Sequence, residues 1–225
     1  ISGNDLTQQK VIRRQITLRP DRPLDMVKLA ESKKNIEDLR LFEGAGTPLS
    51  SVKTTVQPAD PANPGVRDVL VEVEETNTGN VGFIVGVSSD QGLIGEFRLQ
   101  QRNFDVADVP DSFDELIKGR AFRGAGQNFV LSIAPGTEYQ NYQITLGEPY
   151  LFESDYSGSA SAYYRVREYD QYDENRYGTT LALGRRFGER WVASAPVRLE
   201  HVDLSNIDSG APVDVFEVEG PATLT

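Results

Sequence analysis

The chain has 225 residues, enough for one or two domains of about 150 residues each. Its 34 Asp and Glu against 23 Lys and Arg give a formal net charge of −11, whereas a nucleic-acid-binding protein needs a basic face. There is no cysteine, which excludes disulfides, zinc ribbons and thiol catalysis. The composition therefore argues against a nucleic-acid partner.

The membrane is not excluded by this polar composition. No apolar run approaches the ~20 residues that a membrane-spanning helix needs. A transmembrane β-barrel, in contrast, alternates lipid-facing and lumen-facing residues and is hydrophilic on average. The chain also begins at Ile1 without a methionine, so we expect a mature or excised piece.

The first third of the chain carries helical signals. Residues 7–18 fit one face of a helix but also fit a strand, and periodicity alone does not decide between them. Asp25 is placed to cap a helix, because its carboxylate can accept from the first free amides. Gly44 and Gly46 are expected to end that helix. Apolar residues recur at helical spacing at Met26, Leu29, Ala30, Ile36 and Leu39.

Two short alternating segments follow the helical region. The first has Val52, Thr54 and Val56 on one face, and the second, after a Pro- and Gly-rich turn, carries a valine at alternate positions over residues 69–73. This pattern predicts a hairpin with a helix on one face.

From Asn77 onward the chain is almost wholly two-periodic, which predicts about seven strands close to the ~9–11 residues of a membrane-crossing strand. All nine tyrosines lie between Tyr139 and Tyr177, mostly near predicted strand ends, where a girdle of a membrane barrel belongs. The pattern fits a membrane barrel and a soluble β-sandwich about equally well. The expected strands cover residues 81–88, 93–102, 129–133, 141–146, 160–167, 178–184 and 193–200.

Candidates for catalysis or metal binding are few. A catalytic triad would have to use His201, the single histidine, which we expect to be a surface residue at a strand end. Asp170, Asp173 and Glu174 form an acidic cluster whose spacing does not match a calcium loop, and we interpret it as a solvated turn. We expect no enzyme activity, no metal and no cofactor.

Several segments together resemble the BamA family of outer-membrane protein assembly factors. The resemblance runs in family order from Ile1 to about Leu204, and it is clearest in the run Val-Glu-Val-Glu-Glu-Thr-Asn-Thr-Gly at 71–79. The matching segments are residues 3–14, 39–42, 71–79, 82–87, 92–102, 124–127 and 148–152.

This resemblance implies an α+β POTRA domain of order βααββ at 1–76, the last of a series, followed at 77–225 by the antiparallel strands of a partial transmembrane β-barrel. It implies that residues 7–17 form the first POTRA helix with Thr7 as its N-cap. Seven strands are too few for the family's closed barrel, so we expect a fragment. In the long connection 105–122, Ser112 or Asp111 is expected to cap a short helix.

The implied function is the folding and insertion of barrel proteins into the outer membrane, by strand templating at a lateral seam of the barrel. The expected strand-pairing residues are those of the first barrel strand: Val81, Gly82, Phe83, Ile84, Val85, Gly86 and Val87. An edge of the POTRA hairpin is the second expected binding edge, either the strand with Val52, Thr54 and Val56 or the strand over residues 69–73.

The same resemblance implies the location and the partners. The barrel is expected in the cell outer membrane, with the POTRA domain in the periplasm. The expected partners are unfolded outer-membrane proteins, periplasmic accessory lipoproteins of the assembly complex and outer-membrane lipid. The alternatives are a POTRA-containing polypeptide translocation or secretion barrel and a soluble β-sandwich binding module.

Overall fold

The computed structural model describes residues 1–42, 51–59, 61, 64–89, 92–188, 191–211, 215–216 and 220–224. The chain divides into two compact units. The first unit comprises Ile1–Thr78 and Arg102–Gly126, and the second comprises Gly79–Gln101 and Gln127–Thr225. The segment 102–126, which connects two strands of the second unit, therefore belongs to the first unit.

The first unit contains three helices and a two-stranded antiparallel sheet among its described residues. Asp25 caps the longest helix as predicted, because its Oδ1 accepts from the N–H groups of Val27, at 2.9 Å, and Lys28, at 3.3 Å. The expected glycine stop at 44 and 46 lies outside the described residues; the helix itself ends at Asp38. No described helix is long and apolar enough to cross a membrane. The elements are α1 (Gln9–Arg13), α2 (Met26–Asp38), β1 (Lys53–Val56), β2 (Val69–Glu72) and α3 (Phe113–Ile117).

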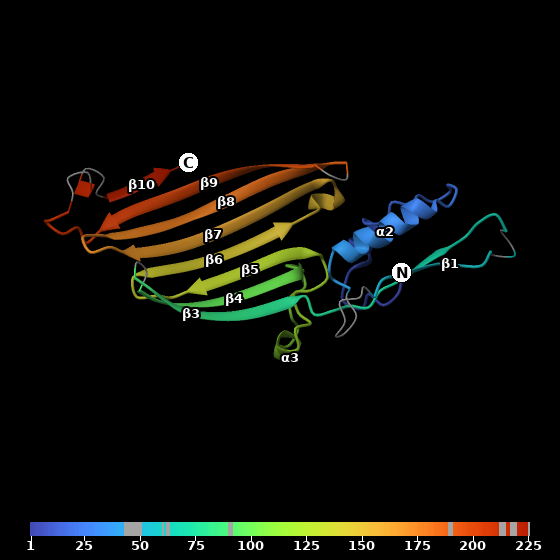
Figure 1. Cartoon of the computed structure of the whole chain (residues 1–225), viewed down its shortest axis with the longest axis horizontal. Coiled ribbons are helices and arrows are strands. Elements are labelled where there is room, and N and C mark those ends of the chain that lie inside the picture. The colour runs from blue at the N-terminus through green and yellow to red at the C-terminus, as the bar shows by residue number, and fades with distance from the viewer. Residues whose placement is uncertain are drawn as a thin grey trace. The chain divides into compact units, whose positions relative to one another are not determined.

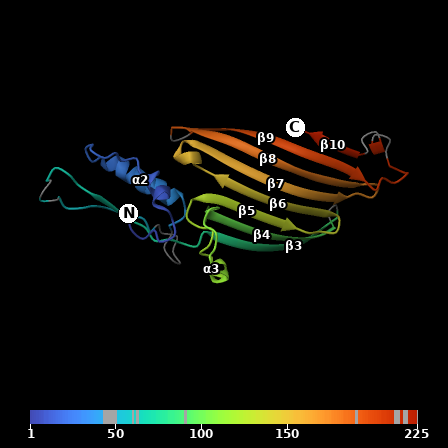
Figure 2. The same cartoon turned by 180° about the vertical axis from the view of Figure 1, so that it is seen from behind.

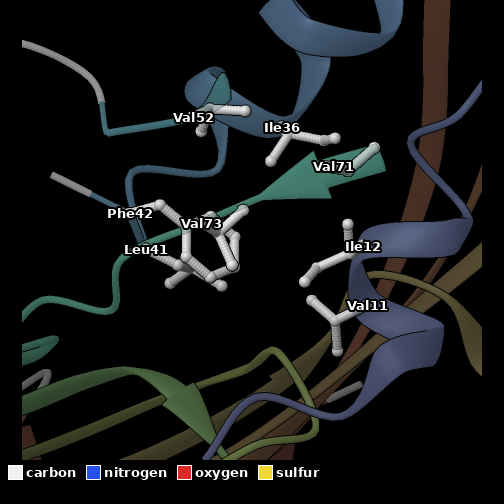
Figure 3. Packing of buried hydrophobic residues seen from close by; sticks show 8 residues of the cluster. All are labelled: Val11, Ile12, Ile36, Leu41, Phe42, Val52, Val71 and Val73. Carbon is white, nitrogen blue, oxygen red and sulfur yellow. The ribbon is translucent and has the colours of Figure 1, made fainter. Parts of the chain in front are cut away.

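A small apolar core holds the first unit together. Figure 3 shows its eight buried side chains, which come from α1, from α2 and the residues after it, and from β2 and the residues beside the hairpin strands. Ser2 adds a parallel bridge to Glu72, so that β2 has backbone partners on both edges while β1 has only β2 among the described residues. The core comprises Val11, Ile12, Ile36, Leu41, Phe42, Val52, Val71 and Val73.

The expected N-cap role of Thr7 is wrong. Helix α1 is shorter than expected, and its N-cap is Gln8, which makes no side-chain capping bond. Thr7 is buried and its hydroxyl instead accepts from the Asn103 amide at 2.8 Å, while its N–H donates to Glu75. The Thr7 hydroxyl, which would have capped the helix, is thus used in a tertiary hydrogen bond with a residue 96 positions away.

This contact belongs to a polar cluster that fastens the connection 102–126 onto the start of α1. Asn103 Oδ1 accepts from the Gly126 N–H at 2.9 Å, and the Gln8 N–H donates to the Gly124 carbonyl at 2.9 Å. Gly124 has φ +125°, and a Cβ there would lie 2.4 Å from the Leu6 carbonyl oxygen. The glycine is therefore required for the close approach of the two segments.

Within the same connection, α3 begins as predicted. The Ser112 hydroxyl accepts from the Glu115 N–H at 3.3 Å, and the Asp111 N–H donates to the Glu115 carboxylate at 3.0 Å. This reciprocal pair satisfies donors at the helix start.

The second unit is a single antiparallel sheet of eight strands, in the order β10-β9-β8-β7-β6-β5-β4-β3 (Figure 1). One strand more is present than the seven expected. The expectation of a partial antiparallel barrel sheet is otherwise confirmed, with β3 and β10 at its two edges. The strands are β3 (Gly79–Ser88), β4 (Gly92–Phe104), β5 (Gln127–Ala134), β6 (Tyr139–Glu148), β7 (Tyr156–Glu168), β8 (Asp173–Phe187), β9 (Trp191–Ser205) and β10 (Gly220–Leu224).

The sheet is one layer seen from either side (Figure 2). None of the large buried hydrophobic side chains described belongs to it; those of the core cluster all lie in the first unit. Leu181 is 53% exposed and Ile144 is 47% exposed, so these side chains do not share a dry interior. The arrangement contradicts a soluble sandwich, in which the apolar faces of two sheets would bury each other.

Candidate functional site: a free sheet edge and an apolar outer face

In the edge strand β3, the backbone N–H and C=O groups of the odd-numbered residues point away from β4. Just before β3, the Arg102 N–H donates to the Thr78 carbonyl at 3.2 Å, and the register continues without a bulge from Gly79 opposite Gln101 to Ser88 opposite Gly92. Hydrogen-bonded and non-hydrogen-bonded pairs alternate along an antiparallel ladder. The even-numbered residues therefore bond to β4, and the backbone groups of the odd-numbered residues point to the free edge. These residues are Val81, Phe83, Val85 and Val87.

The same four residues place their side chains on one face, and the side chains are 55% to 82% exposed. The opposite face has Gly82 and Gly86, where a Cβ would meet nothing within 4 Å. Phe83 pairs with Phe97 across the ladder at a ring separation of 5.1 Å. The predicted strand-pairing segment is thus one continuous strand with an apolar face and an unpaired edge in the part of the chain described.

The register places an apolar face on β6 to β9 as well. Leu146 lies opposite Ala160, which lies opposite Leu181, which lies opposite Val197. Near the other end of the strands, a row of aromatic rings continues the same face, with Tyr142 stacked on Tyr164 at 6.2 Å and Tyr177 against His201 at 4.8 Å. The position of these rings fits the aromatic girdle expected at one border of a membrane barrel.

A second group of rings lies at the other end of the same face. Phe187 lies opposite Trp191, which is 76% exposed. Phe187 is ten positions along β8 from Tyr177, which at ~3.3 Å per residue and a tilt of ~40° gives about 25 Å along the membrane normal. This is the height of the apolar band of an outer-membrane barrel.

The opposite face of β7–β9 is polar and internally paired. The Tyr163 hydroxyl donates to Glu200, and Arg176 donates to Glu200 at 3.1 Å and also to Glu174. Gly178 lies between Tyr163 and Glu200 in the register, and a Cβ there would lie 2.7 Å from the Tyr163 hydroxyl. The glycine leaves room for the ring to cross β8. A face of ion-paired side chains suits contact with water. Tyr163 and Tyr164 lie on opposite faces as the alternation predicts.

The other candidate edge, β1, lies beside a cavity in the first unit. Val52 precedes the strand and is buried in the core, whereas Thr54 and Val56 are half-buried on β1. The cavity, of about 1010 Å³, lies between α2 and the β1–β2 hairpin. Its lining is apolar at Ile16, Leu18, Leu29, Val66 and Val69, with Arg19, Arg22 and Arg67 among the polar residues.

The chemical candidates from the sequence take ordinary structural places. His201 is a strand residue of β9 in the aromatic row, where its ring lies against that of Tyr177. Asp173 accepts from the Asn206 amide at 2.5 Å, and Glu174 pairs with Arg176. The described residues contain no cluster that could hold a metal ion.

Comparisons with known proteins agree with this geometry. Residues 121–221 match the Omp85 superfamily domain. The outer membrane protein assembly factor BamA of Nitratidesulfovibrio vulgaris is 23% identical over 220 residues, which is 98% of this chain and 24% of that protein. The crystal structure of BamA from Haemophilus ducreyi lacking POTRA domains 1–3 matches with a TM-score of 0.68 at 21% identity, covering 91% of this chain and 35% of that chain.

The predicted resemblance to the BamA family is confirmed. The match to the solved BamA structure shows the fold, a partial β-barrel sheet, and the predicted outer-membrane localisation agrees with all three comparisons. The chain spans about a quarter to a third of the length of these relatives.

Proposed function

We propose that this chain is the barrel-entry part of an outer-membrane assembly factor, and that β3 templates the strands of client barrel proteins. The observation that carries the proposal is the edge of β3, whose odd-numbered residues direct their N–H and C=O groups away from β4. Unpaired backbone groups are costly in hydrocarbon, so an incoming strand gains by pairing with them. The work is non-enzymatic: strand exchange needs no covalent intermediate.

The first unit has the role of a periplasmic POTRA domain in this proposal, covering residues 1–76, with the barrel part at 77–225. Its support is two helices followed by a hairpin; where the expected order βααββ has its first strand, the structure has only an isolated bridge at Ser2, so the expected POTRA fold is met in part. The edge of β1 at Val52, Thr54 and Val56 pairs with extended segments of clients or of periplasmic lipoproteins. The adjacent cavity then receives their apolar side chains.

A polypeptide translocation barrel is the second candidate, because the polar face with Glu200, Arg176 and Arg198 suits a water-filled lumen as well. In an assembly factor the seam has to open, whereas in a translocation pore the lumen is the path.

A disulfide between position 85 and the last barrel strand of the intact protein distinguishes the two. We expect this lock to abolish client insertion into proteoliposomes and reduction to restore it, because the edge of β3 is then unavailable. The single Val85→Cys variant, treated identically, is the control. Full insertion activity in the oxidised, locked protein would contradict the templating role and favour the lumenal path.

A further inference from the structure

One arginine lies on the apolar face of the sheet. Arg185 has the same orientation on β8 as Leu181 and Leu183, and it lies opposite Tyr156 on β7. Its guanidinium carbon is 5.2 Å from the centre of the Tyr156 ring and 5.1 Å from that of Phe187. Two rings at the border of the apolar band thus hold one cation.

This cation has no counter-charge within the described part of the chain. Arg176, on the polar face, pairs with both Glu174 and Glu200, but no carboxylate of a described residue forms an ion pair with Arg185. A charge at the edge of an apolar surface is expensive unless it meets an opposite charge or water. The rings supply part of its stabilisation and leave the N–H groups at the edge of the guanidinium open.

We propose that Arg185 binds the phosphate of a phospholipid in the membrane leaflet at this end of the barrel. A guanidinium matches a phosphate with two parallel hydrogen bonds, and the exposed apolar side chains beyond it, including Leu183 at 65% exposure, accommodate the acyl chains. Trp191 lies opposite Phe187 at this end of β8, and tryptophan side chains are typical of the headgroup region of a membrane. The inference rests on the proposed membrane-spanning sheet and adds a defined lipid site to it.

Arg186 is a matched control because it differs from Arg185 mainly in the face it occupies. It is the next residue on β8, carries the same charge, and its guanidinium carbon lies 4.4 Å from the centre of the Tyr150 ring. Its side chain is on the opposite, polar face, where no lipid is expected. Arg185→Gln and Arg186→Gln therefore remove equal charge from the two faces.

Native mass spectrometry of the intact protein, released from detergent in the presence of phosphatidylglycerol, tests the site. We expect the natural protein and Arg186→Gln to retain one phosphatidylglycerol at similar occupancy, and Arg185→Gln to lose about tenfold in lipid affinity, as for a charge-assisted bidentate contact. Diacylglycerol, which has the same chains and no phosphate, should not be retained. Inorganic phosphate at equal concentration should not displace the lipid.

Equal retention by Arg185→Gln and the natural protein would overturn the lipid site, as would equal losses in both variants or displacement by inorganic phosphate. Client insertion is measured on the same samples. Full insertion by the seam-locked protein with lipid still retained rejects the proposed function and leaves this site standing, while normal insertion by a protein that binds no lipid rejects the site and not the proposed function.

Discussion

A Val85→Pro substitution should lower client insertion by the intact protein about tenfold or more, while β3 stays paired with β4. Val85 lies opposite Gly95 at a position whose N–H points to the free edge, so proline removes a donor from that edge and none from the ladder with β4. The unmatched carbonyl of a client strand would then remain unsatisfied in hydrocarbon, at a cost of several kcal/mol.

Two substitutions in β3 provide the controls for this result. Val85→Thr keeps the backbone N–H and should leave insertion close to that of the natural protein. Ile84→Pro removes an N–H on the β4 side and should instead destabilise the hairpin, which urea unfolding of the intact protein in lipid would register. If Val85→Pro inserts clients at the natural rate, then the edge of β3 is not the template.

Replacing Leu181 by arginine should destabilise the intact protein in lipid by about 2–4 kcal/mol, the cost of a cation on a barrel's lipid face near the bilayer midplane. Leu181 is 53% exposed and lies four residues along β8 from Tyr177 in one aromatic row and six from Phe187 in the other. It is therefore close to the middle of the apolar band, where snorkelling to either interface is least effective.

The adjacent residue supplies the matched control. Ala182 lies on the opposite face, and its cross-strand neighbours Ser159 and Pro196 carry no charge. Ala182→Arg should cost about 1 kcal/mol or less, as for a substitution in contact with water. Guanidinium unfolding of both variants in vesicles measures the difference. Equal destabilisation by the two arginines would show that the two faces meet the same medium.

Much of this fold can be predicted from the sequence because strands and helix caps depend on residues that are close together in the chain. Alternation identifies the strands from β3 to β9, and Asp25 is recognisable as a helix cap because the amides it binds are two and three residues away. The strand β10 was missed, since its short segment contains Gly220 and Pro221, which disfavour strand interiors.

Features that depend on distant partners could not be predicted in this way. Thr7 has the residue type of an N-cap, yet its hydroxyl meets Asn103, 96 residues away. Nothing near Asn103 in the sequence indicates that it would be buried at 1% exposure. Arg185 interrupts the apolar side of β8 in the sequence, but only the register with β7 shows that its guanidinium lies beside the Tyr156 ring. Likewise, only the hydrogen bond between Arg102 and Thr78 shows which residues of β3 direct their backbone groups to the free edge.

The apolar face of the sheet should contact lipid chains, and spin labels on β8 would report on that contact. The chain contains no cysteine, so single labels at Leu181→Cys and Ala182→Cys can be placed in the intact protein, freed of any other cysteine and reconstituted in vesicles. Oxygen should relax the label at 181, and a water-soluble nickel chelate should relax the label at 182. A label at 181 that is shielded from oxygen, or that reacts to nickel as 182 does, would contradict it.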